Sequence, residues 1–203
     1  MLVNKNQKNV FSIVEGATEY FSLPHLIKKL GCNPLTPNNL NGIGDDWNLE
    51  ALVRKRLYRS VVAASYKPRC DHILIVFDRE SRSESAYKIA DTVLKALSLE
   101  LQKNNKHLTQ RVSVVICDRH FENWIIADYE ALTRLPYISA SLATKVGTQS
   151  DGKLGKSILE SVFKGKRKYH ETRDAPVFCQ TIDITNPKVQ GRSDSLKKLV
   201  SSL

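Results

Sequence analysis

Three short apolar runs in this chain of 203 residues are each followed at once by carboxylate side chains. The runs cover residues 10–14, 72–77 and 112–117. The carboxylates that follow them are Glu15, Glu19, Asp78, Glu80, Asp118 and Glu122. Carboxylates that are brought together repel one another and raise one another's pKa, so a group of them favours a bound cation. Oxygen ligands of this kind select Mg²⁺ or Mn²⁺.

Each of these residues also has a simpler explanation when it is taken alone. Glu19 and Glu122 would favour the positive end of a helix if they lie in its first turn. Asp118 would serve as the N-cap of the helix that follows it. A strand-terminal Glu followed by Gly, together with an Asp-x-Glu at the end of a buried strand, is an uncommon combination, and it favours a shared site.

The apolar runs predict the strands that would position these carboxylates. Residues 72–77 are continuously apolar, as a central parallel strand must be when both of its faces are covered. Helical spacing of apolar residues predicts helices at residues 17–30, 47–65, 83–103 and 121–132. Strands that alternate with helices predict an α/β fold with a mainly parallel sheet, whose functional groups gather at the carboxyl ends of the strands.

The pattern is weaker after Pro136. Residues 154–163 and 193–203 favour helices, and residues 177–184 favour an edge strand. We therefore expect an α/β core over residues 1–135 and a basic C-terminal extension over residues 136–203 that packs on it.

Positive charge is concentrated in that extension. The chain has a net charge of +10, and residues 153–203 contain eleven Lys or Arg against five Asp or Glu. The densest part, residues 164–170, combines lysines and an arginine with Tyr169 and His170. Such a segment can hold phosphates and stack a base, so it indicates a nucleic-acid partner. Charge alone is equally compatible with a solvated loop.

Composition excludes several classes of protein. No apolar run approaches the ~18–20 residues of a membrane span, and residues 1–9 lack the apolar region of a signal peptide. The four cysteines contain no Cys-x-x-Cys pair of the kind that binds zinc. No P-loop motif is present, so the chain itself is not an ATPase of that kind. We expect a protein of the cytoplasm.

Two of the acidic motifs resemble those of the TOPRIM superfamily, which includes topoisomerases, primases and the overcoming-lysogenization-defect (OLD) nucleases. The family pattern is an apolar strand that ends in Glu-Gly, followed by a strand that ends in Asp-x-Asp. Here these read Phe11-Ser-Ile-Val-Glu15-Gly16 and Ile73-Leu-Ile-Val-Phe-Asp78-Arg79-Glu80. The second carboxylate of the Asp-x-Asp pair is therefore a Glu in this chain. The spacing of Glu15 and Glu19 looks like the paired glutamates of the OLD nucleases.

A third motif extends the resemblance to nearly the whole chain. Residues 121–128 look like the Phe-Glu-x-Trp-x-x-x-Asp signature of a small bacterial TOPRIM-like family, whose members are often encoded beside an ABC-type or AAA ATPase in phage-defence loci. The basic segment, Gly191-Arg192-Ser193 and a closing amphipathic helix also agree. The resemblance implies a TOPRIM (Rossmann-like) fold, an anti-phage role and a partner ATPase that controls the protein.

The resemblance also implies hydrolysis of phosphodiesters of DNA or RNA with two Mg²⁺ or Mn²⁺ ions. Glu15 and Glu19 would bind one metal, Asp78 and Glu80 the other, and Glu122 would complete the site. Glu15 is alternatively a general base. Lys168, with Arg192 as the second choice, would stabilise the developing charge on the phosphate. The residues expected to hold the nucleic acid are Lys164, Lys166, Arg167, Lys168 and Arg192.

Two other functions stay open at the level of the sequence. A TOPRIM-like fold can lose catalysis and remain as a module that binds nucleic acid or a partner protein. A phosphoryl-transfer enzyme that acts on small molecules, such as a nucleotide hydrolase, would use a similar acidic site in a narrower pocket. The sequence does not distinguish DNA from RNA, and it leaves open whether the chain forms a homo-oligomer.

Overall fold

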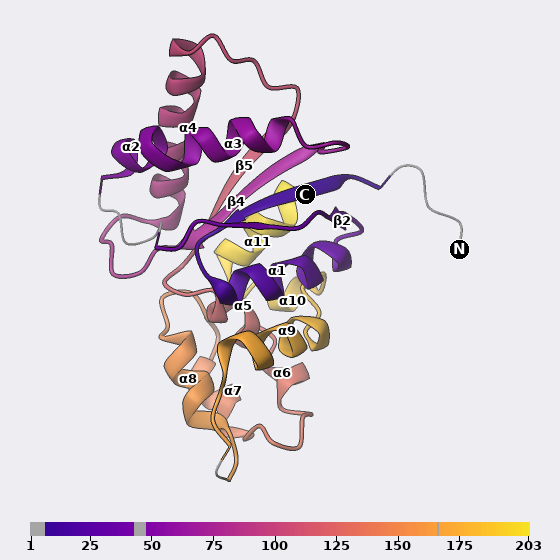
Figure 1. Cartoon of the computed structure of the whole chain (residues 1–203). Helices are drawn as coiled ribbons and strands as arrows, with labels where there is room; N and C mark the ends of the chain where they lie inside the picture. The colour runs from indigo at the N-terminus through magenta and orange to yellow at the C-terminus, as the bar shows by residue number, and fades with distance from the viewer. Residues whose placement is uncertain (1–6, 43–47, 166) are drawn as a thin grey trace.

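A parallel β-sheet forms the centre of the computed structural model, which describes residues 7–42, 48–165 and 167–203 (Figure 1). Within these residues the sheet has five strands, in the order β2-β1-β4-β5, and β3 also pairs with β1. The strands are β1 (Asn9–Val14), β2 (Asn33–Pro34), β3 (Asn38–Asn39), β4 (His72–Asp78) and β5 (Arg111–Cys117). All pairings between these five strands are parallel, which confirms the predicted α/β fold class with a mainly parallel sheet.

Side chains of the central strands alternate between two hydrophobic layers, because successive residues of a strand point to opposite faces. Val10, Val14, Leu74 and Val76 lie in one buried cluster. Phe11, Ile13, Ile73 and Ile75 lie in the other. Both faces of β1 and β4 are therefore covered, which explains why these strands are almost continuously apolar.

Helices from the N-terminal half cover both faces. The helix α1 (Ala17–Lys29) packs on the first face. On the opposite face lie α4 (Ala86–Lys103) and a continuous helical segment made of α2 (Leu49–Leu52), the π-helical turn η1 (Val53–Leu57) and α3 (Tyr58–Ser65). The helices predicted at residues 17–30, 47–65 and 83–103 are thus confirmed over the described residues, and Gly31, with a φ of +73°, follows α1 as predicted. None of the helices in these parts of the chain has the length and apolar character of a membrane span.

The predicted helix at residues 121–132 is broken in two. The helix α5 (Glu122–Ile126) ends before Asp128, whose carboxylate accepts a hydrogen bond from the Ala131 amide (3.1 Å) and caps α6 (Tyr129–Leu132). The second oxygen of Asp128 accepts a hydrogen bond from the Asp183 amide (2.7 Å). Asp128 therefore joins two helices to the C-terminal part of the chain.

The C-terminal part is helical throughout its described elements. These are α7 (Ser141–Val146), α8 (Gly155–Val162), α9 (Glu171–Thr181), α10 (Pro187–Gln190) and α11 (Asp194–Ser202). The predictions for residues 154–163 and 193–203 are confirmed, whereas the edge strand predicted at residues 177–184 is wrong. Ala175, Phe178 and Cys179 repeat at helical spacing and are buried, while Val177 is 44% exposed. This packing against the rest of the fold decides in favour of a helix.

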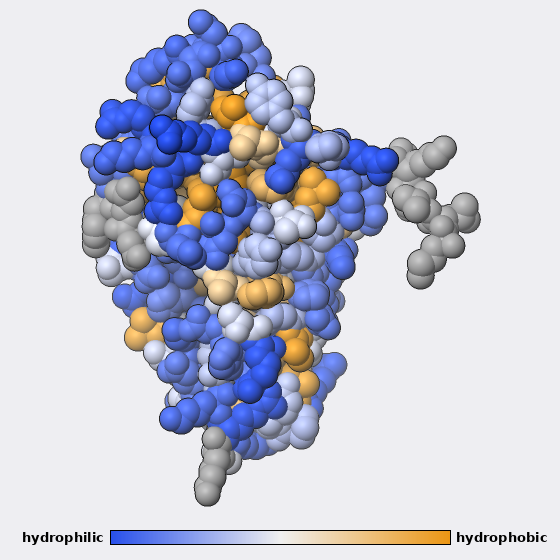
Figure 2. Space-filling model, viewed as in Figure 1, coloured by the Kyte–Doolittle hydropathy of each residue, from blue (hydrophilic) through white to orange (hydrophobic). Residues whose placement is uncertain are grey.

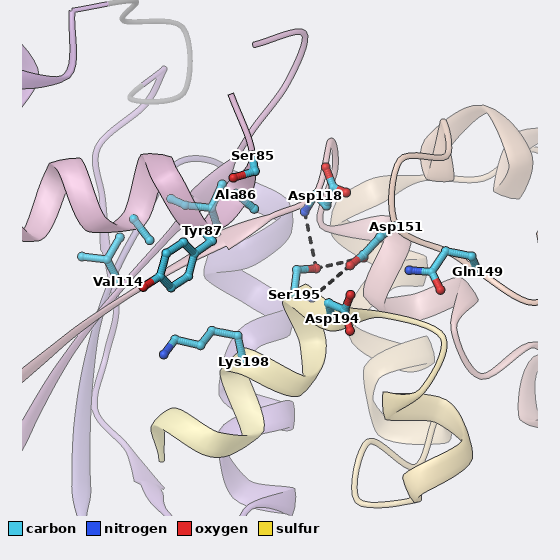
Figure 3. Close-up of a pocket in the computed structure, with 12 residues that line it drawn as sticks. Ser85, Ala86, Tyr87, Val114, Asp118, Gln149, Asp151, Asp194, Ser195 and Lys198 are labelled. Carbon is cyan, nitrogen blue, oxygen red and sulfur yellow. Dashed lines mark hydrogen bonds between the residues drawn. The ribbon is translucent and has the colours of Figure 1, made fainter. Parts of the chain in front are cut away.

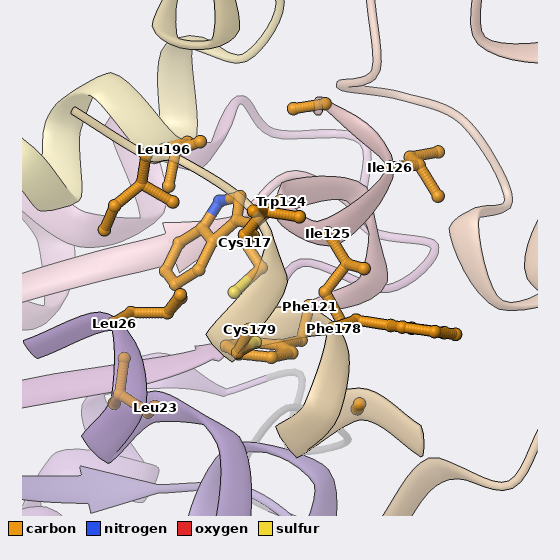
Figure 4. Packing of buried hydrophobic residues seen from close by; sticks show 14 of the residues in the cluster. Leu23, Leu26, Cys117, Phe121, Trp124, Ile125, Ile126, Phe178, Cys179 and Leu196 are labelled. Atoms are coloured by element: carbon orange, nitrogen blue, oxygen red, sulfur yellow. The ribbon is translucent and has the colours of Figure 1, made fainter. Parts of the chain in front are cut away.

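One hydrophobic cluster runs across the boundary that we expected near residue 135. Leu23 and Leu26 of α1, Trp124 of α5 and Phe178 of α9 all belong to it (Figure 4). The indole Nε1 of Trp124 donates a hydrogen bond to Ser195 Oγ (2.7 Å) in α11. The C-terminal helices therefore share a core with the sheet, and the division into residues 1–135 and 136–203 stays a prediction.

Gly155 allows α8 to approach α5 closely. A Cβ atom at this position would lie 2.8 Å from the Asn123 backbone nitrogen, 2.9 Å from the Glu122 carbonyl carbon and 2.3 Å from the Asn123 Oδ1 atom. Real Cβ atoms do not approach backbone this closely, so any larger residue must push the two helices apart.

We predict that Gly155→Ala lowers the free energy of unfolding by about 1–3 kcal/mol, because the added methyl group overpacks the contact between α5 and α8. Thermal unfolding should show a midpoint lower by several degrees. Ser157→Ala, on the exposed side of α8, is the matched control and should unfold as the wild type does. An unchanged midpoint for Gly155→Ala would show that the helices are not held this closely.

Candidate functional site

A cavity of about 380 Å³ lies where the chain changes direction between the two central strands. The chain leaves β1 to cover one face of the sheet with α1, and it returns over the opposite face before it enters β4, the neighbour of β1. The crevice at such a switch point is the usual ligand site of open α/β sheets. The carboxylates that line this cavity are Glu15, Glu19, Asp78, Glu80, Glu122 and Glu171.

Glu15 and Asp78 join the ends of the two central strands. Val14 pairs with Val76 in the sheet, so both strands end at the same edge. The Asp78 amide donates a hydrogen bond to Glu15 Oε2 (3.0 Å). Asp78 itself is 8% exposed, and its buried Oδ1 atom has no hydrogen-bond partner among residues 7–42, 48–165 and 167–203. A buried carboxylate oxygen without a partner is costly, unless a cation or a proton accompanies it.

Glu19 is held at the start of α1. Its Oε2 atom accepts a hydrogen bond from the Gly16 amide (3.1 Å) and completes the N-terminal cap of the helix. A Cβ atom at residue 16 would lie 3.0 Å from the same oxygen, so glycine leaves room for this contact. The structural role that we considered for Glu19 is therefore present, and the residue also lines the cavity.

Two neighbouring loops present Glu80 and His120. Glu80 and Arg119 both have a left-handed backbone, with φ values of 54° and 77°, and the Glu80 amide donates to the Arg119 carbonyl (3.1 Å). His120 Nε2 lies 3.6 Å from Glu80 Oε2. Asp118 forms an ion pair with Arg79 and does not cap α5, whose N-cap is Phe121. Strained non-glycine residues cluster at functional sites, which agrees with the position of these loops.

Glu122 enters the cavity from the first turn of α5. It is 4% exposed, and its Oε1 atom accepts a hydrogen bond from the Tyr169 hydroxyl (3.1 Å). Tyr169 comes from the basic segment of the C-terminal part and is itself buried. The aromatic residue of that segment therefore supports the site from within the core, and it is not available to stack a nucleic-acid base.

Burial and mutual repulsion raise the pKa values of three of these acids, Glu19, Asp78 and Glu122. Burial, with contributions from Glu122 and Glu15, raises the pKa of Glu19 to about 8. Burial also raises the pKa of Asp78, and Glu19, Glu122, Glu15 and Glu80 add to the shift. For Glu122, burial outweighs the hydrogen bond from Tyr169 and raises the pKa. The cavity thus holds more carboxyl groups than it can keep ionised without a cation.

The chemistry of this donor set fits a hard divalent cation, since carboxylate oxygens are the ligands that Mg²⁺ and Mn²⁺ prefer. The buried Oδ1 of Asp78 supports this fit because it accepts no hydrogen bond from any residue that the structure describes. Across residues 7–42, 48–165 and 167–203, no three His, Cys, Asp or Glu side chains already stand around a common point as metal ligands do.

The sequence did not reveal that Lys156 and Glu171 belong to this cavity. Lys156, in the first turn of α8, forms an ion pair with Glu171, the first residue of α9. Glu171 Oε2 also accepts a hydrogen bond from Thr18 Oγ1 (3.1 Å) in α1. Hydrogen bonding to Glu171 raises the pKa of Lys156, so this side chain is a cation at the wall of an acidic cavity. No motif marks Lys156, because its position depends on the close packing of α8 against α5.

The residues that we expected to contact phosphate lie elsewhere. Lys164 and Lys168 are exposed and do not line the cavity, and Lys166 lies outside the described residues. The guanidinium of Arg167 lies over the rings of Tyr137 and Phe163, with 4.0 Å and 5.2 Å to the centroids, and it pairs with Asp174. These contacts hold Arg167 against the protein.

Arg192 is only 4% exposed. Its guanidinium pairs with Glu130 (2.9 Å) and donates to the Ala127 carbonyl (2.9 Å). These contacts explain the presence of an arginine there, and the structure does not bring this residue to the acidic cavity or to the surface.

A second cavity, also of about 380 Å³, lies beside β5 between α4 and α11 (Figure 3). Of the carboxylates that follow the three apolar runs, Asp118 lines this second cavity, and none of the residues expected to bind metal or nucleic acid does. Its most buried carboxylate, Asp151, accepts hydrogen bonds from the hydroxyls of Ser193 (2.6 Å) and Ser195 (2.9 Å). These contacts connect the loop before α8 to the start of α11, so Asp151 has a structural explanation.

A family model described as "Domain of unknown function (DUF4276)" matches residues 14–203. The chain belongs to this family. No curated protein matches the sequence. The chain is similar in structure to the C-terminal region of the Burkholderia pseudomallei OLD protein. The two share 12% sequence identity with a TM-score of 0.45, and the match covers 94% of this chain and 98% of the other. The C-terminal region of the Xanthomonas campestris pv. campestris OLD protein follows, with 13% identity, a TM-score of 0.41, and coverages of 96% and 94%.

We predict that Glu19→Gln stabilises the metal-free protein at alkaline pH. The pKa of Glu19 is about 8 in the folded protein against an ordinary value of 4.5. The stability that the protonated Glu19 side chain contributes to the fold is therefore fully present below pH 4.5 and is lost as the pH rises through 8. Glutamine cannot ionise and still accepts a bond from Gly16. In thermal unfolding with EDTA, the free energy of unfolding of both proteins should fall between about pH 5 and about pH 8.5. The fall should be smaller in the variant than in the wild type, by on the order of 2 kcal/mol.

The matched control is Glu160→Gln, on the exposed side of α8, which should leave the pH dependence as it is in the wild type. If the free energy of unfolding depends on pH in the same way for the wild type and for Glu19→Gln, Glu19 is not buried among other acids.

Proposed function

We propose that this DUF4276 protein is a metal-dependent nuclease that hydrolyses phosphodiester bonds of DNA or RNA. The observation that carries the proposal is the convergence of Glu15, Glu19, Asp78, Glu80 and Glu122 on one cavity. These five residues come from three strand ends that are far apart in the sequence, and they are the residues that the TOPRIM resemblance singled out. A nucleotide hydrolase that uses the same acids is the competing enzyme.

The five carboxylates would hold Mg²⁺ or Mn²⁺, which when bound polarise the phosphoryl group and lower the pKa of the attacking water. The remaining steps belong to the protein. The hydrogen bond from the Asp78 amide orients Glu15, and the Gly16 amide orients Glu19. Tyr169 fixes Glu122 at the wall of the cavity. These hydrogen bonds restrict the orientations of Glu15, Glu19 and Glu122 before a metal ion binds.

Lys156 is the cation that we now propose at the reacting phosphate, in place of Lys168. It lines the cavity, whereas Lys168 does not. Glu171 holds its ammonium group, and Thr18 in turn holds Glu171. A lysine in this position can donate a hydrogen bond to a phosphate oxygen as negative charge develops on it. The exposed Lys164 and Lys168 would contact the nucleic-acid backbone further away, where they contribute no sequence specificity.

The regulatory role of a partner ATPase and an anti-phage function remain parts of this proposal. They derive from the resemblance of the motifs and have no counterpart in the geometry of the cavity.

We predict that Glu15→Gln and Asp78→Asn each reduce cleavage of nucleic acid by at least about 100-fold, because each removes a charged ligand while its shape is kept. The measurement is the cleavage of labelled DNA and RNA, single-stranded and duplex, in Mg²⁺ and in Mn²⁺, and again with EDTA. Glu50→Gln, at an exposed position of α2 on the face of the sheet opposite α1, is the control with the same change of charge and should cleave as the wild type does.

If cleavage persists in EDTA, or in both variants, this cavity is not the catalytic site. If the wild type binds nucleic acid but cleaves none of these substrates, the protein is the binding module that the sequence also allowed. If it hydrolyses free nucleotides and no polymer, the competing enzyme is the correct one.

We also predict that Lys156→Ala lowers kcat by about 100- to 1,000-fold, the effect of removing one donor that stabilises developing charge. Lys168→Ala should instead raise KM at low salt and leave kcat nearly unchanged, because an exposed lysine acts on binding. Lys156→Arg keeps the charge and should retain more activity than Lys156→Ala. Equal effects of the two alanine variants on kcat would contradict the assignment of Lys156.

A further inference from the structure

Two helices form an outer face next to the acidic cavity. The exposed or half-exposed residues of α1 on this face are Phe21, His25 and Lys28, and those of α9 are Arg173, Val177 and Gln180. We call these six residues the α1–α9 face. Phe21 is 50% exposed, which is unusual for a phenylalanine of a folded protein. Its ring meets that of Tyr20 at 84°, with the centroids 5.1 Å apart, so its position is fixed by a neighbour.

The α1–α9 face begins at the mouth of the cavity. Ala17 and Thr18 line the cavity, and they precede Phe21 by four and three positions on the same helix. Residues at these spacings are neighbours on one face of a helix, about 5–6 Å apart at Cβ. The side chain of Phe21 is therefore the next group that a ligand meets when it leaves the cavity along α1.

Contacts at both ends show that α1 and α9 run side by side in the same direction (Figure 1). Thr18 bonds to Glu171 where the two helices begin. Near the other end, His25 Nε2 lies 3.3 Å from Gln180 Nε2, and Lys29 donates to the Gln180 carbonyl (2.9 Å). The face is therefore a continuous strip that extends away from the cavity for most of the length of α1.

The strip is cationic. Lys28 is exposed, and Lys29 lies beside it. Arg173 is 61% exposed, and the carboxylate that it contacts, Asp174, is 2% exposed and also pairs with Arg167. Two arginines therefore share one acid, which leaves positive charge at the start of α9. Glu171, at the cavity end of the strip, is paired with Lys156, and Asp183 interacts with Lys29 at the other end.

The hydrophobic surface on this side of the molecule occurs in small areas separated by hydrophilic side chains (Figure 2). Stable protein interfaces have a larger apolar centre. An isolated exposed aromatic ring among cations is instead typical of surfaces that bind single-stranded nucleic acid, where bases stack on rings and lysines contact the phosphates.

We propose that the α1–α9 face binds single-stranded nucleic acid and that Phe21 stacks on the base next to the phosphate held in the cavity. This inference rests on the proposed nuclease function for the position of that phosphate. It adds the substrate class, since a base in a duplex is paired and stacked on both sides and cannot lie on Phe21 without being extruded. Lys28 then contacts the backbone a few nucleotides further along.

The experiment is the binding of fluorescein-labelled oligonucleotides, a 15-nucleotide oligo-dT strand and a mixed-sequence 15-base-pair duplex, measured by fluorescence anisotropy in EDTA and again in Ca²⁺, a cation that carboxylates bind and that neutralises the acids of the cavity. Phe21→Ala should weaken binding of the single strand roughly 5- to 100-fold and leave duplex binding within about twofold. Phe21→Tyr and Phe21→Trp should retain binding, whereas Phe21→Leu, which stays apolar without a π-face, should lose it. Lys28→Ala should lower the slope of log K against log salt by about 0.7.

Tyr87→Ala is the matched control, because Tyr87 is 78% exposed and lies on α4, across the sheet from α1. Analytical ultracentrifugation of the wild type and Phe21→Ala gives the oligomeric state. The proposal is overturned if Phe21→Ala binds the single strand as the wild type does, if Phe21→Ala weakens binding of the duplex equally, or if Phe21→Leu binds the single strand as the wild type does. It is also overturned if Phe21→Ala changes only the oligomeric state, which would identify a protein contact.

The two proposals can fail separately, because EDTA removes the dependence of this test on cleavage. A wild type that cleaves nothing, together with selective loss of strand binding in Phe21→Ala, would end the nuclease proposal and support the α1–α9 face. If the wild type cleaves nucleic acid and Phe21→Ala binds the single strand with unchanged affinity, the nuclease proposal is supported and the proposal for the α1–α9 face is overturned.

Discussion

The repulsion among buried carboxylates at the ends of β1 and β4 is the constraint on which the rest of this structure depends. Glu19, Asp78 and Glu122 are each at most 8% exposed, and burial raises the pKa of each. Such a group destabilises the fold around it, so it must be held by a framework that is stable without it. The two hydrophobic layers on β1 and β4 supply that framework. The acids themselves are fixed by donors that the local backbone provides, as with the Asp78 and Gly16 amides.

The C-terminal helices belong to the site as much as to the core. They bring Lys156 and Glu171 to one wall of the cavity, and Tyr169 to Glu122 behind it. The approach of α8 depends on Gly155, and the approach of α9 depends on its long contact with α1. The signature residues Trp124 and Asp128 connect the same helices to the core, since both bond to the C-terminal part. In this protein, the signature motif thus supports the assembly and contributes Glu122 to the cavity.

The sheet and its acidic edge could be predicted because both depend on local sequence. A short continuous apolar run bounded by polar residues favours a covered strand, and the residue that follows such a strand lies at the edge of the sheet. Lys156 could not be found in this way, since its place is set by contacts between helices that are remote in sequence. Arg192 was misjudged for the same reason: a basic residue in a basic region is not distinguishable from one that pairs with Glu130 until the fold is known. At residues 177–184, apolar residues suited a strand as well as a helix, and packing against α1 decided between them.

The net charge of +10 is a sum over two neighbouring regions of opposite charge, the cationic α1–α9 face and the acidic cavity. A nucleic-acid strand on the α1–α9 face would meet cations along most of its length and six carboxylates at one end. Its phosphates are repelled there unless the acids are neutralised, either by protons at lower pH or by divalent cations. Neutralisation of the cavity and binding of the strand must therefore strengthen each other to the same extent, because a coupling free energy between two sites is reciprocal. Such coupling would make the strand and the cations bind together, and it follows from the placement of the charges alone.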